Sequence, residues 1–294
     1  MQIASEMNWH EVREPNDAEL DRLAEQYTLH SLHVEDCRHR GQIAKVEENH
    51  NYLFVVLKPV DVEPDGSLAF GDLDLFLGRD FLITVEESDS AVTRQLMETL
   101  RPIAPGLRAD QLFYRVVDAV VDSYLPLLDR LDDLSDALED EVLERPSPEA
   151  LERIFGAKRN LVELRRAFAN TRDVAGHLLR NSSGWIAQDM GPFLRDLYDH
   201  VARNLDRVEV QRELLTGALE IYLSSVTQRT NQVMKVLTVL GTIALPALLV
   251  TSFYGMNLQG LPWSHSPHGA LLALAVICGL TGTLLLLLRV LDWF

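Results

Sequence analysis

Residues 236–257 read VLTVLGTIALPALLVTSFYGMN, an apolar run that ends in the tripeptide Gly255-Met256-Asn257. A second apolar run covers residues 269–288, and no Lys, Arg, Asp or Glu occurs from 236 to 288. Residues 236–254 and residues 269–288 are each long enough to cross a hydrocarbon core of about 30 Å as an α-helix. We therefore expect two transmembrane helices joined by an outer loop at residues 255–268. The competing interpretation is a buried hairpin in the core of a soluble protein.

The positions of basic residues predict how the two spans are oriented. Arg229 and Lys235 precede the first span, Arg289 follows the second, and the loop between them has no Lys or Arg. By the positive-inside rule, both termini are expected in the cytoplasm. Residues 1–17 are polar and acidic and lack the basic and apolar regions of a signal peptide. We expect a multi-pass protein of the inner (plasma) membrane with a short cytosolic tail at residues 289–294.

The net charge is -17, and all of it belongs to residues 1–235 because Arg289 and Asp292 cancel. So acidic a region does not bind nucleic acid by neutralising phosphates. It attracts divalent cations, although ordinary solubility also explains part of the excess acid. Cys37 and Cys278 lie in different parts of the chain and are not expected to pair, as in a reducing compartment. The sequence has no P-loop, G-x-S-x-G or His-Glu-x-x-His motif, so we expect neither an enzyme nor a nucleotide-binding protein.

The first part of the acidic region, residues 1–108, is predicted to be a cytosolic α/β domain. Residues 52–57, 73–77 and 81–85 are short apolar runs rich in β-forming side chains. Such runs are typical of strands that are buried on both faces. Residues 18–27 have the spacing of a short amphipathic helix.

Helical spacing dominates the rest of the soluble region. Apolar residues recur every three or four positions in residues 109–190, interrupted at Pro146 and Pro148, which predicts long antiparallel helices. The same spacing then runs through residues 191–235, a predicted stalk, into the first span. A helix continuous through both would be about 95 Å long. One stalk cannot cover its own apolar stripe, so it implies self-association around an axis. The competing interpretation is a break near Gly217 and a separate membrane hairpin.

Four segments resemble one family of membrane proteins. They are Tyr222-Leu223-Ser224-Ser225, Asn231-Gln232-Val233-Met234-Lys235-Val236-Leu237-Thr238, Tyr254-Gly255-Met256-Asn257, and His30-Ser31-Leu32-His33-Val34-Glu35-Asp36, which is similar to a His-Pro-Leu-x-x-Glu-Asp segment. Their order and spacing resemble the CorA-type magnesium/cobalt transporters, a superfamily with a Gly-Met-Asn motif. The resemblance implies an α+β protein whose stalk helix continues into the first of two transmembrane helices. It also implies a funnel-shaped homopentamer in the bilayer, with five stalks lining one ion channel for passive influx of Mg2+ and Co2+.

The resemblance places the selectivity filter at Gly255, Met256 and Asn257. Mg2+ gives up its water reluctantly. A ring of neutral Asn257 carboxamides can accept hydrogen bonds from the hydrated ion, whereas a ring of carboxylates would hold it too tightly for rapid release. Gly255 would let neighbouring backbones approach closely at the turn. The competing role for Asn257 is a helix C-cap.

One face of the first span is predicted to line the pore. The residues that step along this face by three or four positions are Asn231, Met234, Thr238, Gly241, Leu245, Leu248 and Ser252. At 100° per residue they stay within an arc of about 100°. Met234 and Leu245 could form apolar rings that gate by dewetting. Leu245 and Leu248 stand where magnesium members of the family often have Met and Thr. The competing interpretation is ordinary helix packing.

The resemblance also implies a regulatory site for cytosolic Mg2+. Asp36 matches an acid that in the family faces a stalk acid of the neighbouring subunit. Asp196 matches that partner, and Asp118 resembles a third ligand. Carboxylates crowded across a subunit seam repel unless a divalent ion lies between them, so bound Mg2+ would clamp the subunits and close the pore. Taken alone, each acid is more often a solvated surface residue or a helix cap.

Besides Leu245 and Leu248, two further departures from the family pattern keep other functions open. The outer loop has no acid at residues 261–264 but has His265 and His268, and imidazole suits Zn2+ or Ni2+ better than Mg2+. Residues 289–294 have one Arg and one Asp in place of a lysine cluster. One alternative is a zinc or nickel transporter of the same superfamily. Its ion flux could be coupled to protons. Met256 in the tripeptide favours the magnesium branch. The other alternative is a membrane metal sensor or scaffold that transports nothing.

Overall fold

The computed structural model describes residues 7–15, 18–39, 41–86, 90–181, 184–256, 262–263 and 266–291. The chain forms two compact units, Met1–Leu219 and Glu220–Phe294. The boundary between them falls within one helix, α7 (Gly191–Gly255). The domain limits expected at residues 108, 190 and 235 stay predictions.

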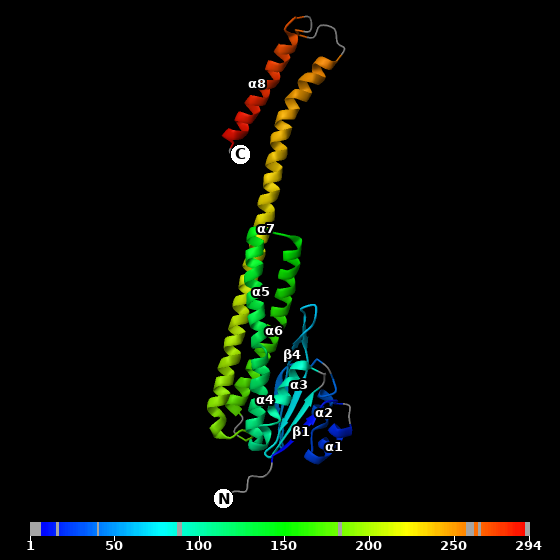
Figure 1. Cartoon of the computed structure of the whole chain (residues 1–294), viewed down its shortest axis with the longest axis vertical. Helices are drawn as coiled ribbons and strands as arrows, with labels where there is room; N and C mark the ends of the chain where they lie inside the picture. Colours follow the sequence, from blue (N-terminus) through cyan, green and yellow to red (C-terminus); the bar gives the residue numbers. More distant parts are fainter. Residues whose placement is uncertain are drawn as a thin grey trace. The chain divides into compact units, whose positions relative to one another are not determined.

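A five-stranded sheet organises the N-terminal part of the first unit (Figure 1). In spatial order it consists of β1 (Asn8–Val12), β7 (Phe81–Glu86), β6 (Leu73–Leu77), β3 (Leu53–Leu57) and β2 (Lys45–Glu48). β1 is parallel to β7, and all the other neighbours are antiparallel. A separate hairpin pairs β4 (Val60–Val62) with β5 (Leu68–Phe70). The three predicted strands correspond to β3, β6 and β7. We did not predict β1, because its sequence NWHEV is short and mostly polar.

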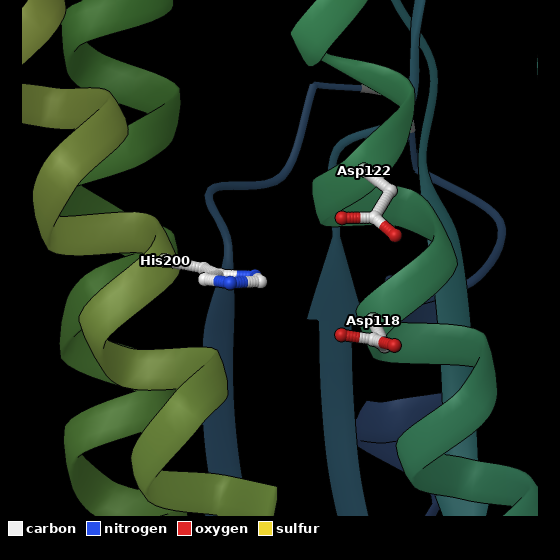
Figure 2. A group of neighbouring side chains, drawn as sticks. All are labelled: Asp118, Asp122 and His200. Atoms are coloured by element: carbon white, nitrogen blue, oxygen red, sulfur yellow. The ribbon is translucent and has the colours of Figure 1, made fainter.

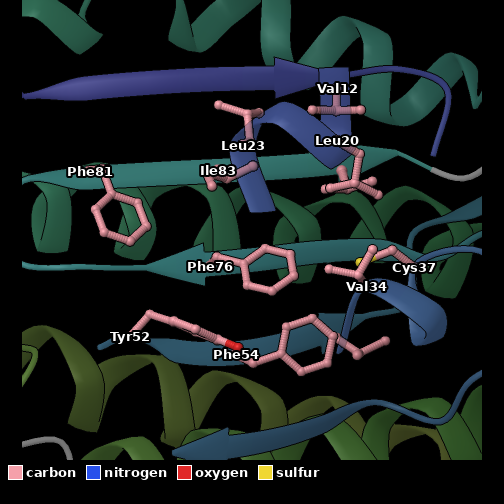
Figure 3. Packing of buried hydrophobic residues seen from close by; sticks show 12 residues of the cluster. Val12, Leu20, Leu23, Val34, Cys37, Tyr52, Phe54, Phe76, Phe81 and Ile83 are labelled. Carbon is pink, nitrogen blue, oxygen red and sulfur yellow. The ribbon is translucent and has the colours of Figure 1, made fainter. Parts of the chain in front are cut away.

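Both faces of the sheet are covered, and β3 and β6 are accordingly buried at every residue. On one face lie α1 (Ala18–Tyr27) and α2 (Ser31–Asp36), which pack around an apolar cluster (Figure 3). The cluster consists of Val12, Leu20, Leu23, Val34, Cys37, Tyr52, Phe54, Val56, Phe76, Phe81, Ile83 and Val85. From the other side α4 (Ala109–Ser123) contacts β6 and β7, and α3 (Ala91–Leu100) packs against α4. The sheet therefore holds α2 and α4 in fixed places.

The helical region differs from the prediction at one point. We expected one helix from residue 109 to Pro146, whereas the structure has α4 and then α5 (Leu125–Glu144), which share Tyr124 as their junction. Pro126, in the first turn of α5, has no N–H with which to continue the hydrogen bonds of α4. The apolar stripe continues across the junction, so spacing alone did not reveal it. Two short 3-10 helices, Ala104–Gly106 and Gln188–Met190, precede α4 and α7.

Within the first unit, α5, α6 (Pro148–Asn181) and the N-terminal part of α7 form a bundle. Arg207 on α7 is paired with Asp129 on α5 at 2.6 Å, and Arg165 on α6 is paired with Glu209 on α7. The long antiparallel helices predicted for this region are α5 and α6. This bundle holds the start of α7 against the rest of the unit.

The second unit contains the remainder of α7 and α8 (Gly269–Val290). α7 passes through Gly217 as a helix, so the break considered near that residue is not there. Both helices are long and apolar enough to cross a membrane. No residue of α8 is buried, which contradicts the interpretation as a buried hairpin of a soluble protein.

Candidate functional site

Two acids of α4 and a histidine of α7 form a group that fits a metal ion. Asp118 and Asp122 lie one turn apart, so both project from one face of α4. His200 projects toward them from α7 (Figure 2). One ligand atom from each of the three side chains lies within 4.8 Å of the others. Asp118 and His200 are partly buried, and Asp122 is exposed.

Asp196 extends this group along α7. It lies one turn before His200, and its Oδ1 is 3.8 Å from Nε2 of that residue. Tyr114 hydrogen-bonds Asp118, and its ring centroid lies 5.5 Å from that of Phe193. Burial, followed by the charge and hydrogen bond of Asp118 and by the charge of Asp196, raises the pKa of Tyr114 to about 12. Two of the three acids predicted for regulation, Asp118 and Asp196, therefore lie in one neighbourhood of a single chain.

The electrostatics of this group favour a bound cation. Burial raises the pKa of Asp118, and the charge of Asp122 raises it further, while the hydrogen bond from Tyr114 and the nearby His200 act in the opposite direction. Two carboxylates at such short range repel each other unless a positive charge lies between them. Carboxylate oxygens suit Mg2+, and an imidazole nitrogen adds affinity for transition metals such as Co2+ or Zn2+.

Sequence reasoning missed Asp122 and His200 as candidate ligands. Their signal was a four-residue spacing on each helix: Asp118 to Asp122 on α4, and Asp196 to His200 on α7. Residues four apart share one face of a helix. That pattern does not say which helix faces the other, so only the packing of α7 beside α4 brings the two pairs together.

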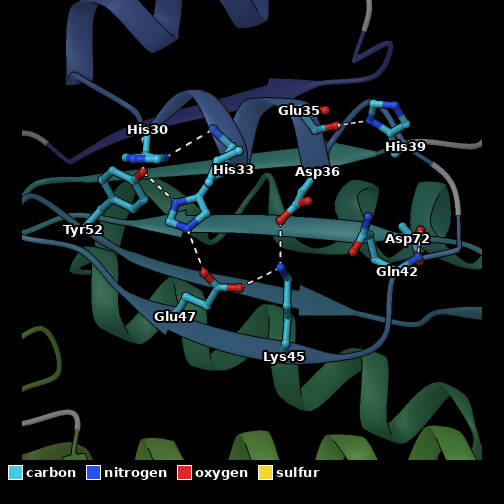
Figure 4. A network of polar contacts seen from close by, with 11 residues as sticks. His30, His33, Glu35, Asp36, His39, Gln42, Lys45, Glu47, Tyr52 and Asp72 are labelled. Carbon is cyan, nitrogen blue, oxygen red and sulfur yellow. Dashed lines mark hydrogen bonds and ion pairs between the residues drawn. The ribbon is translucent and has the colours of Figure 1, made fainter.

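The third predicted acid, Asp36, has a different environment in the chain. It is the last residue of α2, and its Oδ2 lies 2.7 Å from Nζ of Lys45 on β2 (Figure 4). It does not join the group at Asp118 within the described residues of one chain. The predicted role of Asp36, in which this residue faces a neighbouring subunit, stays a prediction.

The proposed filter lies at the end of α7. Gly255 is the last residue of the helix, and Met256 follows it with an exposed side chain. Asn257 lies outside the described residues, as does His265. His268 is described and stands directly before α8. The geometry of the Asn257 ring is therefore still a prediction.

All seven residues predicted to line the pore lie on α7. Met234, Leu245 and Leu248 are each more than half exposed in the single chain. The hydroxyl of Thr238 donates to the carbonyl of Met234 at 2.9 Å, which leaves the oxygen lone pairs of Thr238 available to water. This uncharged face carries apolar side chains with a few polar groups between them.

Comparison with known proteins gives the family. The sequence matches the family described as "CorA-like Mg2+ transporter protein" over residues 4–289. The chain belongs to this family. It is 38% identical to the cobalt/magnesium transport protein CorA of Thermotoga maritima over 88% of this chain and 75% of that relative. It is 26% identical to the protein of the same name from Methanocaldococcus jannaschii over 92% of this chain and 86% of the relative.

Solved structures agree with the CorA fold. The complete CorA magnesium transporter from Methanocaldococcus jannaschii matches with a TM-score of 0.82 and 25% identity, covering 97% of this chain and 91% of that one. The full-length CmaX protein also has a TM-score of 0.82, at 24% identity over 100% of this chain and 91% of its own, and shows the likeness of fold alone. The predicted α+β fold with a long helix and two C-terminal membrane helices is confirmed. CorA proteins are transporters, so the chain is a transporter of divalent cations and not an enzyme.

Proposed function

We propose that this protein is a homopentameric channel for passive Mg2+ influx, with Co2+ as a second permeant ion. The observation that carries the proposal is the end of α7. From Val236 onward the helix has no charged residue, and it ends at Gly255, directly before Met256 and Asn257. Relatives named as cobalt/magnesium transport proteins support the choice of ions. In this proposal both termini lie in the cytoplasm, and the outer loop faces away from it.

The proposed conduction path needs no dehydration of Mg2+. Five Asn257 carboxamides at the entrance accept hydrogen bonds from the ion's first-shell water, and the uncharged face of α7 then conducts the hydrated ion. Rings of Met234 and Leu245 exclude water when they close. Thr238 and Asn231 provide polar positions on either side of Met234.

The proposed regulation uses the acids of the soluble unit. Cytosolic Mg2+ binds among Asp118, Asp122, Asp196 and His200 and reaches Asp36 of the neighbouring subunit. The bound ion cancels the repulsion between carboxylates and holds the subunits in the closed arrangement. When internal Mg2+ falls, the ion leaves and the open arrangement gains population. Sites of few carboxylates bind weakly, so inhibition is expected at millimolar Mg2+.

Uptake into proteoliposomes tests this proposal. Wild type should admit Mg2+, and Asn257→Ala should lose most of that flux because the ring of water-binding oxygens is gone. Gln232→Ala is the matched control. It also removes a side-chain amide, but on the side of α7 that is opposite to the predicted pore-lining face, so it should leave the flux unchanged. If Asn257→Ala still admits Mg2+ at the wild-type rate, Asn257 does not form the selectivity filter.

Zn2+ transport is the second candidate, because His200 lies in the acidic group and His268 directly before α8. Zn2+ entry that grows with an inward proton gradient, together with little Mg2+ entry, would support it. If neither ion enters, the protein acts as a membrane sensor or scaffold.

A further inference from the structure

A fixed ammonium group already neutralises Asp36. Lys45, the first residue of β2, places Nζ 2.7 Å from Oδ2 of Asp36. The two side chains are only 24% and 26% exposed, respectively. Figure 4 shows the pair bridging from α2 to the edge of the sheet. The acid proposed to face the neighbouring subunit thus has a cation of its own chain as a partner.

The position of Lys45 is set by a chain of hydrogen bonds. Nζ also lies 2.7 Å from Oε1 of Glu47, and 5.7 Å from the centre of the Phe54 ring. Oε2 of Glu47 is 3.1 Å from Nε2 of His33, whose Nδ1 is 2.8 Å from the hydroxyl of Tyr52. The backbone N–H of His30 donates to that same hydroxyl, which can therefore donate its proton to His33. Each group in such a connected network limits the movement of the next.

This arrangement also sets the direction of the hydrogen bond between His33 and Glu47. Nε2 of His33 faces the carboxylate of Glu47, which can only accept, so Nε2 carries a hydrogen and donates it to Oε2 of Glu47. Glu47 is held at both oxygens, by His33 on one and Lys45 on the other. The ammonium is therefore shared between two carboxylates and is anchored beside Asp36.

We infer that Lys45 competes with the regulatory divalent cation for Asp36 and so sets the Mg2+ concentration at which the channel closes. The inference rests on the proposed function, since it assigns Asp36 to the regulatory site. An ammonium and a metal ion neutralise the same carboxylate, and an ion that coordinates Asp36 must displace Lys45 or bind against its charge. Glu47 moderates the competition, because it accepts part of the hydrogen bonding of the ammonium. Lys45 is a positioning residue that acts through Asp36.

Lys45→Met tests the competition, because methionine keeps an apolar stem over Phe54 but has no charge. Half-inhibition of uptake should occur at about two- to fivefold lower internal Mg2+, the size expected for a partly exposed ion pair. Arg38→Met is the matched control. The guanidinium of Arg38 pairs with Asp21 at 2.7 Å and donates to the carbonyl of Pro15 at 3.0 Å, so this variant removes a nearby charge without removing the competitor and should shift half-inhibition much less.

The double variant Lys45→Met with Asp36→Asn isolates the path of the effect. If Lys45 acts through Asp36, adding Lys45→Met to Asp36→Asn should produce no further shift. An equal shift with and without Asp36, or an equal shift in Arg38→Met, would show a general field effect and overturn the inference. Lys45→Arg, which keeps the charge, should stay near wild type and shows that the site tolerates substitution.

Calorimetric titration of the full-length protein with Mg2+ separates the two ideas. If Lys45→Met binds Mg2+ more tightly than wild type but the protein transports no ion, the competition between Lys45 and Mg2+ is supported and the transport proposal is rejected. If wild type binds Mg2+ and is inhibited by it, and Lys45→Met changes neither property, only the competition is rejected. Wild-type protein that neither binds Mg2+ nor is inhibited by it would reject the regulatory site and the competition together.

Discussion

At the scale of single residues, the acidic group on α4 and α7 is defined by what surrounds each carboxylate. Asp118 is partly buried beside Asp122, and both effects disfavour its charged form. Asp36, in contrast, has a basic partner in its own chain, because Lys45 lies against it. Two acids assigned to the same regulatory role therefore begin with different needs for a cation.

The raised pKa of Asp118 predicts a pH dependence of Mg2+ binding, because a proton and a metal ion compete for its oxygens. We expect affinity to fall as the pH drops from neutrality through this raised pKa, and to begin falling at a higher pH than for an ordinary aspartate. In the metal-free protein the folded state holds this proton more tightly than the unfolded chain, so the contribution of Asp118 to the free energy of unfolding rises as the pH falls.

Calorimetry across a pH series measures this effect. Asp118→Asn should weaken Mg2+ binding and remove most of its pH dependence, whereas Asp133→Asn, at an exposed acid of α5, should change neither. A pH profile that is identical in wild type and Asp118→Asn would place the titrating group elsewhere.

At the scale of elements, α7 combines two environments in one helix. Its first part carries Asp196 and His200 within the bundle, and its later part is uncharged. Pro246 lies inside this later part. Proline has no N–H, so the carbonyl of Thr242 lacks its usual partner four residues along, and the ring crowds the same turn.

Pro246→Ala should restore this backbone hydrogen bond and raise the thermal midpoint of the full-length protein. The cost of an interior proline is about 3 kcal/mol in water, and less in a membrane, where neighbouring groups offset it. Thermal unfolding in detergent measures the change, with Ala247→Gly as a control that should lower the midpoint by removing a good helix former. A lower midpoint for Pro246→Ala would mean that packing at the proline ring stabilises α7.

At the scale of the whole molecule, charge and assembly are coupled. The net charge of -17 lies outside the membrane helices, and a homopentamer would bring five such regions together. Self-repulsion destabilises a compact state. A divalent ion bound at each set of acids would reduce that repulsion and stabilise the assembly.

Mg2+ should therefore raise the thermal midpoint of the wild-type protein. A ligand that binds only the folded state adds about 2.7 kcal/mol at 100 times its Kd. The variant Asp118→Asn with Asp196→Asn should lose most of the Mg2+-dependent rise. NaCl at matched ionic strength is the control for screening, and an equal rise in NaCl would contradict specific binding. Native mass spectrometry on the same samples gives the number of subunits, for which we expect five.

Local patterns in the sequence determined much of this protein. Two uncharged runs predicted the membrane helices, continuous apolar runs predicted β3, β6 and β7, and motif order gave the family. These features depend on neighbouring residues in the chain, so they can be seen without the fold. The sequence did not predict the boundary between α4 and α5, because the apolar stripe continues across it. It did not predict β1, because that strand is short and mostly polar.

The tertiary structure alone decided which polar groups meet. Asp118 and Asp122 reach His200 because α7 packs beside α4, although the chain between them is long. Asp36 meets Lys45 because the fold brings the end of α2 to the start of β2. Spacing along a helix fixes which residues share a face, but the direction of that face depends on the packing of apolar side chains elsewhere. For that reason the sequence could identify candidate acids. The fold determined which of them share a site and which are already paired with a basic side chain.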